Sequence, residues 1–494
     1  MSRDKERGDI DDKDRSQPSA FWTTLAYGII IGWPLACVGS EASADSDLGS
    51  PPITVTRSTT YATAGFPFSA VISRSGAVLV SVTADGRATS ATGVQVFDRR
   101  REGWMARCLN ALPASVGPGA DAEVLSLFSG TRDAAMGIGR PGAIFYRVED
   151  LLACNGGGYV VGQGSTGPLG AGTFAVAVTP DGKFAFVANE YGVAVGASTE
   201  GNIGVVAIER DFEGNLTGST ALIGQIPTGG NAVAGLVISP DGRRVYVTSE
   251  VAAKGIVASG GGNPVLARTG CLQQAGSVPT RNGLLTVIDA AAAETNPGTA
   301  AILATIDAGC SPVRMAETRD QKTLWVSARG DDRLLAFDTA TLELNPDAAL
   351  LGYAATGGTA PVGIRLFQHD LFLAVANSNR FDTGVANATI LDVTCPDSAK
   401  IVQTIPTGSF PREINVAPDD ATLLLTNYLS ETFQVIETST RIWDDRNDEA
   451  PSAAGRGTSR ENDSARKPRP IGCQRPDHES PGNSGPSTGE SDSN

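Results

Sequence analysis

The sequence has only two histidines, His369 and His478, in 494 residues. Histidine is the commonest metal ligand and the usual base of Ser-His-Asp catalysis. His369 lies in a turn between two apolar segments, and His478 lies in a polar C-terminal tail. No Cys/His cluster has the spacing of a zinc site, and no Asp-x-Asp-x-Asp calcium loop occurs. We therefore expect no metal site and no catalytic triad.

Basic residues are scarce as well. The 39 Lys and Arg residues against 54 Asp and Glu residues give a net charge of −15. Nucleic acids and anionic membranes attract basic surfaces, so we expect neither as a partner. The glycine runs at 156–158 and 260–262 are not followed by a helical pattern, and no Walker loop or dinucleotide fingerprint is present. We expect no cofactor.

The sequence does contain a repeat. Two copies are nearly complete: FAVAVTPDGKFAFVAN begins at Phe174, and LVISPDGRRVYVTS begins at Leu236. Apolar residues alternate on both sides of a Pro-Asp-Gly turn, which is the pattern of an antiparallel β-hairpin. Degraded copies begin at Ala70, Met315, Ile364 and Ile414, and the weakest copy starts at Glu123. Together they make seven units.

The aligned copies share a register. Seven residues before the turn stands an anchor residue, which is proline in four of the six aligned copies. Third and fourth apolar segments follow the hairpins, for example at 203–209 and 221–229. Seven units of four antiparallel strands predict an all-β fold, a seven-bladed β-propeller. The segment 53–59 matches the fourth strands, so we expect this N-terminal strand to complete the last blade and close the ring.

The repeat resembles a known family. SPDGRRVYVTSE at Ser239–Glu250 and TPDGKFAFVANE at Thr179–Glu190 are similar to YVTN-type propeller repeats. Those repeats overlap with the seven-bladed lactonase-like propellers, and the resemblance covers roughly residues 50–440. The family includes sugar-lactone hydrolases, muconate-type cyclases and surface antigens. The resemblance therefore implies the fold and leaves the activity open.

Segments of different character flank the repeats. An apolar run starts at Phe21 and is followed by Ala42-Ser43-Ala44, which suits signal peptidase. Residues 1–44 are thus expected to be a signal peptide, with an uncleaved membrane anchor as the alternative. We expect a propeller at 45–443 and a disordered polar tail at 444–494. The whole describes a secreted, cell-surface or periplasmic protein, which we expect to be a monomer.

Cysteine usage agrees with export. Apart from Cys37 the chain has an even set of six cysteines, as disulfide-bonded proteins of oxidising compartments do. Six cysteines allow fifteen pairings. The fold suggests three of these pairs: Cys108–Cys154, Cys271–Cys310 and Cys395–Cys473. The alternative is buried thiols in an intracellular protein.

Hairpin geometry predicts where functional groups gather. The start of the first strand and the end of the second lie at the same end of an antiparallel hairpin. The loops before the anchors and after the second strands should therefore surround one mouth of the central channel. The candidate catalytic residues there are Glu413 and Arg412. The candidate substrate-binding residues are Arg314, Arg365, Arg329, Asn377, Asn427, Tyr428 and Glu190.

Two functions fit such a mouth. Arginines beside carboxylates and amides suit a small anionic or polyoxygenated metabolite, and a desolvated Glu413 would serve as a general base. The first hypothesis is accordingly hydrolysis or isomerisation of a lactone. Lactone-cyclising propellers use a histidine with arginines and a glutamate, and this chain offers no mouth histidine. The second hypothesis is a non-catalytic scaffold for a protein or glycan partner. Asn377 and Asn427 are equally explained as turn formers.

Overall fold

The computed structural model describes residues 52–440, apart from gaps at 88–89, 117–118, 129–131, 141, 162–170, 193–199, 272–279 and 381–384. The expected signal or anchor segment and the expected C-terminal tail lie outside the described residues. Within the described range, no helix is long and apolar enough to cross a membrane.

Seven four-stranded antiparallel sheets form in the described chain, as predicted. Blade 1 comprises β2 (Phe66–Ile72), β3 (Val78–Thr83), β4 (Gly93–Arg100) and β5 (Gly103–Ala111). Blade 2 comprises β6 (Leu125–Phe128), β7 (Asp133–Gly137), β8 (Ala143–Arg147) and β9 (Tyr159–Val161). Blade 3 comprises β10 (Ala171–Val178), β11 (Phe184–Tyr191), β12 (Asn202–Arg210) and β13 (Leu216–Pro227). Blade 4 comprises β14 (Gly230–Ile238), β15 (Arg244–Ala252), β18 (Leu284–Asp289) and β19 (Ile302–Asp307).

The remaining blades follow the same order. Blade 5 comprises β20 (Pro312–Glu317), β21 (Thr323–Ala328), β22 (Arg333–Asp338) and β23 (Leu350–Ala355). Blade 6 comprises β24 (Pro361–Phe367), β25 (Phe372–Asn377), β26 (Asn387–Asp392) and β27 (Lys400–Pro406). Blade 7 comprises β28 (Pro411–Val416), β29 (Thr422–Asn427), β30 (Thr432–Thr440) and, as its outer strand, β1 (Ile53–Ala62). Strand β1 pairs with β30 from Ile53 opposite Thr440 to Ala62 opposite Thr432.

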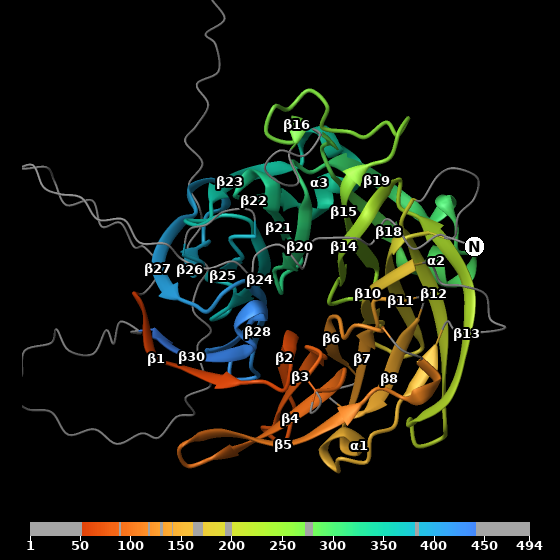
Figure 1. The fold of residues 1–494 in the computed structure, drawn as a ribbon. Helices are drawn as coiled ribbons and strands as arrows, with labels where there is room; N and C mark the ends of the chain where they lie inside the picture. Colours follow the sequence, from red (N-terminus) through yellow and green to blue (C-terminus); the bar gives the residue numbers. More distant parts are fainter. Residues whose placement is uncertain are drawn as a thin grey trace, which may run out of the picture. The chain divides into compact units, whose positions relative to one another are not determined.

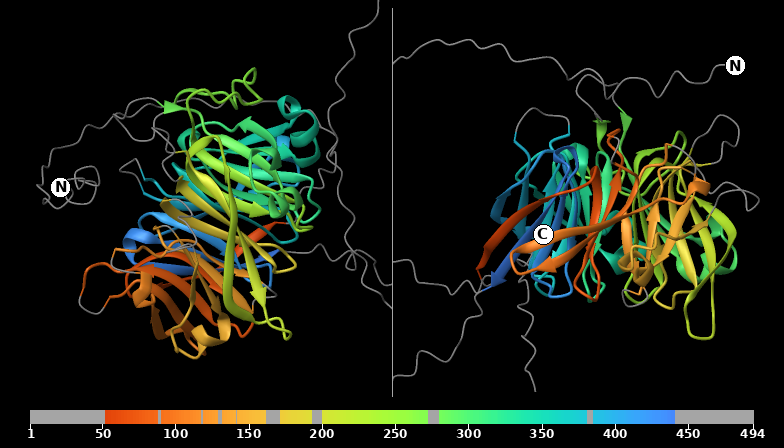
Figure 2. Two further views of the ribbon diagram at one scale, coloured as in Figure 1. Left: turned by 90° about the vertical axis from the view of Figure 1, so that its right-hand side faces the viewer. Right: turned by 60° about the horizontal axis from the view of Figure 1, so that its bottom comes forward.

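The first strands of the seven blades line the centre of the propeller (Figure 1). Each contacts the first strand of the next blade, in the cycle β2, β6, β10, β14, β20, β24, β28 and back to β2. Figure 2 shows the strands running between the two faces of the ring. Hydrophobic cores fill the spaces between blades, and one of them packs Val78 and Val80 of blade 1 against Leu424 and Phe433 of blade 7.

Hydrogen bonds between side chains of the turn itself stabilise the hairpin turns. The hydroxyl group before the turn donates to the aspartate two residues later, as Thr179 does to Asp181 at 2.7 Å and Ser239 to Asp241 at 2.6 Å. The next position adopts the left-handed conformation, with φ of +72° at Gly182 and +74° at Gly242. Glycine has no Cβ and adopts this conformation without steric cost, which is why Pro-Asp-Gly marks the turn.

Hydroxyl groups on the second strands form hydrogen bonds that join neighbouring blades. The side chains of Ser81, Thr248, Ser327 and Thr426 each donate to a carbonyl oxygen on the inner segment of the next blade at 2.8–2.9 Å. The acceptor of Thr426 is Phe68, so this bond joins blade 7 to blade 1. Thr426 also accepts from the backbone N–H of Glu413 at 3.1 Å. Such bonds satisfy buried backbone groups that a blade edge would leave unpaired.

Short helices connect the third and fourth strands of three blades. They are α1 (Val148–Leu152), α2 (Ala290–Thr295) and α3 (Thr339–Leu344). Asp289 and Asp338 cap α2 and α3 by accepting from backbone N–H groups at 2.9 and 2.7 Å. These caps satisfy donors that have no partner inside the helix.

Two of the suggested disulfides are present. Cys108–Cys154 ties β5 to the end of α1 across a Cα–Cα distance of 6.0 Å, and Cys271–Cys310 has a Cα–Cα distance of 5.4 Å. The suggested partner of Cys395 is Cys473, which lies outside the described residues. Two disulfides are typical of a protein in an oxidising compartment.

Candidate functional site

The predicted ends of the strands lie on one face. Pro411 pairs with Asn427, Pro361 with Asn377 and Pro312 with Ala328. We call this face, which carries the starts of the inner strands and the ends of the second strands, the mouth face. The face that carries the hairpin turns is the turn face.

Side chains close the channel near the mouth face. The residues that directly follow the six anchors form a ring of side chains there. They are Phe68, Phe174, Ala234, Val313, Val362 and Arg412. The five apolar members are only 2–7% exposed. Ala234, Val313 and Val362 pack together, while Phe68 meets Phe174 edge to face at 5.6 Å. These buried side chains lie between the mouth face and the groups further along the inner strands.

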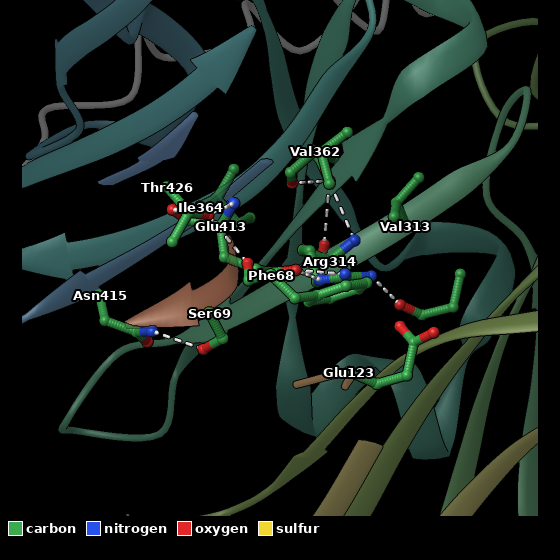
Figure 3. Close-up of polar contacts among 12 residues, drawn as sticks. Phe68, Ser69, Glu123, Val313, Arg314, Val362, Ile364, Glu413, Asn415 and Thr426 are labelled. Atoms are coloured by element: carbon green, nitrogen blue, oxygen red, sulfur yellow. Dashed lines mark hydrogen bonds and ion pairs between the residues drawn. The ribbon is translucent and has the colours of Figure 1, made fainter. Parts of the chain in front are cut away.

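A buried ion pair lies beside this ring (Figure 3). Arg314 donates from Nε to Glu413 Oε1 at 2.5 Å, and its Nη1 donates to the carbonyl oxygen of Ala234. The side chains are 7% and 2% exposed. Arg314 belongs to blade 5 and Glu413 to blade 7, so the pair reaches across blade 6. Blade 6 has Gly363 here, where a Cβ would lie 2.7 Å from the Arg412 carbonyl oxygen.

Arg412 has a different environment, made of aromatic rings. Its guanidinium carbon lies 3.7 Å from the ring centroid of Phe68, 5.0 Å from Tyr428 and 5.8 Å from Phe410. Tyr428 also stacks on Phe66 at 5.2 Å. Burial lowers the pKa of Arg412, yet an arginine remains charged in proteins. No carboxylate or carbonyl of the described residues accepts a hydrogen bond from this guanidinium, although cation–π contacts stabilise it.

Two carboxyl groups share the electrostatic environment of Arg412. Burial raises the pKa of Glu123 to about 7, and the positive charge of Arg412 opposes that rise. Burial and the nearby charge of Glu250 raise the pKa of Glu190, which Arg412 also opposes. Neither the Glu123 nor the Glu190 side chain has a hydrogen-bond or ion-pair partner in the described part of the chain. Figure 3 shows the Glu123 carboxyl group near Arg314.

The other predicted charged residues lie either on the mouth face or further along the channel. Arg329 lies in the 3-10 turn η3 (Arg329–Asp331) on the mouth face. Its guanidinium group donates to the Glu250 carboxylate, near the end of β15, at 2.6 Å. Arg365 lies further along β24 and donates to Asn415 at 3.1 Å. Arg412 and Tyr428 are in contact at the mouth, and Glu190 and Arg329 lie on the same face, whereas Arg365 lies away from them.

The predicted asparagines form hydrogen bonds close to their own strand ends. The Asn377 amide donates to Asn387 at 2.7 Å and to the Thr356 carbonyl at 3.2 Å. Asn427 accepts from the Gly408 N–H at 3.1 Å and donates to Thr432 at 3.3 Å. Both residues are almost completely buried. Their hydrogen bonds hold the strand ends, which agrees with the alternative interpretation as turn formers.

Sequence reasoning found Tyr428 but missed Glu123 and Phe68, which also lie near Arg412. Glu123 begins the weakest copy of the repeat, which lacks both the Pro-Asp-Gly turn and the proline anchor. Phe68 directly follows the anchor Pro67, so the shared register of the repeat indicates that it lies near the mouth.

The insertion at 251–281 leaves the mouth face at the end of β15, a position from which a long loop can cover the mouth. Within its described part, Leu266 is fully buried in the core beside Ile306, and Arg268 pairs with Asp331 at 3.0 Å. These contacts fix the described part of the insertion to blades 4 and 5, so they do not support a freely moving lid.

Among the described residues, no group of three or more His, Cys, Asp or Glu side chains is arranged to hold a metal ion. The mouth therefore offers arginine, carboxyl and aromatic groups. This combination can bind an anion, contact an apolar ligand face and transfer a proton.

Comparison with known proteins supports the fold. One similar solved chain belongs to "Crystal Structure of Mitotic Checkpoint Complex", with 12% sequence identity and a TM-score of 0.51. The similarity covers 83% of this chain and 98% of that one. At such low identity the match shows the propeller fold alone. No protein-family model matches the sequence, and no curated protein matches it.

Proposed function

We propose that this protein is an exported β-propeller that binds a small anionic or polyoxygenated metabolite at its mouth, with Arg412 as the main ligand. One observation carries the proposal: Arg412 is a largely buried cation that stacks on aromatic rings and donates no hydrogen bond to a described residue. A buried charge needs hydrogen-bonding partners, and a bound carboxylate would supply them bidentately.

The finer proposal is lactone chemistry, which the resemblance to lactonase-like propellers suggests. Opening a lactone requires polarisation of its carbonyl group and deprotonation of water. Arg412 is suited to the first role and Glu123 to the second, because a carboxyl group with a pKa of about 7 can accept and donate protons near neutral pH. Glu413 is less suited as the base, since its carboxylate is already engaged by Arg314.

Binding is tested by isothermal titration calorimetry with gluconate and other sugar acids, comparing wild type with Arg412→Gln. We expect the substitution to weaken binding by at least tenfold, since a charged hydrogen bond contributes about 1.5–3 kcal/mol. Arg243→Gln is the control, because that side chain is 79% exposed on the turn face. Equal affinity in wild type and Arg412→Gln would refute the mouth site.

Catalysis is tested in a pH-stat with sugar and aromatic lactones. Glu123→Gln should abolish turnover while gluconate binding remains. Glu317→Gln is a matched control, because burial raises the pKa of Glu317 to about 7 as well, at the turn-face end of β20. Turnover that survives in Glu123→Gln would remove Glu123 from the reaction. Binding without turnover in wild type would leave a metabolite-binding protein.

A second candidate is a scaffold that binds a protein or glycan partner. The strand ends and described loops of the mouth face expose five large apolar side chains: Tyr191, Ile256, Val257, Val385 and Leu429. Exposed apolar groups on one face are typical of interaction surfaces when they form a patch. Chemical cross-linking on the producing cell, compared with a Val257→Ser/Leu429→Ser variant, tests this candidate. A partner captured equally by both would exclude these side chains.

A further inference from the structure

A cavity of about 230 Å³ lies along the channel. One wall is mostly apolar and comes from blades 2, 3 and 4, with Phe128, Val176, Val178, Leu236 and Ile238 among its residues. The other wall comes from blades 5, 6 and 7 and carries Arg314, Met315, Arg365 and Glu413. The cavity thus has one hydrophobic side and one charged side.

The cavity opens away from the mouth. Phe128, Val178 and Ile238 end their strands next to the hairpin turns, and each is partly exposed. At the opposite end the cavity meets Phe174, a member of the ring that closes the channel and only 5% exposed. Ligands would therefore enter from the turn face, whereas ligands of Arg412 would enter from the mouth face.

The charged wall carries an excess positive charge. Arg314 and Glu413 neutralise each other in their ion pair. Arg365 donates from Nε to Asn415 and from Nη1 to the Ile364 carbonyl oxygen, both at 3.1 Å. No carboxylate of the described chain pairs with Arg365, and its Nη2 group has no acceptor there. Burial lowers the pKa of Arg365.

We infer that this cavity is a second ligand site, which binds a small monocarboxylate with an apolar body. The carboxylate would accept from Arg365, and the apolar body would lie against β6, β10 and β14. Unpaired buried charge is costly, so an anion is the expected occupant, and the facing wall favours hydrocarbon over water. At about 30 Å³ for each water-sized group, the cavity holds about eight such groups. Hexanoate has about this size.

The site is independent of the proposed mouth function. It uses a different arginine, opens on the other face, and lies beyond the closing ring. Loss of one site therefore leaves the other measurable, and the two proposals fail separately.

Ligand-detected NMR and calorimetry with hexanoate test the inference on the intact protein. We expect hexanoate to bind at millimolar concentration or better, and hexan-1-ol and hexylammonium to bind at least tenfold more weakly. Arg365→Gln should weaken hexanoate by tenfold or more, and Arg412→Gln should leave it unchanged. Ala177→Leu, which fills the apolar wall while keeping Arg365, should also abolish binding. This second variant gives an answer even if Arg365→Gln does not fold.

Three results would overturn the inference. The first is no hexanoate binding to wild type. The second is hexan-1-ol binding as tightly as hexanoate, because the cation would then contribute nothing. The third is binding that survives both Arg365→Gln and Ala177→Leu, which would place hexanoate elsewhere.

Discussion

Replacing Glu413 by glutamine should destabilise the propeller strongly. The substitution removes the negative charge that Arg314 contacts, and both side chains are almost completely buried. The remaining acceptor of Arg314 is the Ala234 carbonyl oxygen. Breaking a buried ion pair by removing one partner costs about 3–5 kcal/mol, because the other charge stays buried. For a folded unit of this size, that loss lowers Tm by about 4–6 °C.

The assay is urea denaturation followed by circular dichroism, with thermal melting as a second measurement. The double variant Arg314→Met/Glu413→Leu is the decisive comparison, since it removes both charges and refills the space. We expect it to be more stable than Glu413→Gln alone. A loss below 1 kcal/mol in Glu413→Gln would refute the reasoning. So would a double variant that is less stable than the single one.

Three further predictions concern turns, blade contacts and pH. Thr426→Val removes the hydrogen bonds of a buried hydroxyl group and should cost about 1–3 kcal/mol in urea denaturation; an unchanged midpoint would contradict its role in joining blades 7 and 1. Gly242→Ala should destabilise the protein by about 1 kcal/mol because φ is +74°, whereas Gly262→Ala, in open space, should be neutral; equal effects would contradict the turn argument. Burial raises the pKa of Glu123 in the folded state from 4.5 to about 7. The protonated carboxyl group therefore stabilises the folded state at low pH, and this stabilisation is lost as pH rises from about 4.5 to about 7. Glu123→Gln should therefore become more stable than wild type as pH rises through this window; parallel pH profiles would contradict the assigned pKa.

The architecture was predictable because a repeat carries it. Alternating apolar residues around a turn determine a hairpin, and the shared register determines how the inner strands align. Even the weak copy at Glu123 forms its blade. The YVTN/lactonase-like family remains a resemblance of the repeat, since the structural match supports the propeller fold alone.

The site was predictable only in part. Hairpin geometry places Arg412 and Tyr428 at the predicted mouth, because strand ends follow from the register. It does not determine which charges neutralise each other. Glu413 pairs with Arg314 across an intervening blade, and that pairing depends on the curvature of the ring and on the small volume of Gly363. The order along the sequence carries no such information.

The most direct test of the mouth site is a crystal structure of the protein soaked with gluconate. The account predicts electron density on the mouth face, with a carboxylate contacting the Arg412 guanidinium and the ligand beside Glu123. Density at the exposed rim alone, or an Arg412 side chain that contacts no ligand at saturating gluconate, would contradict it.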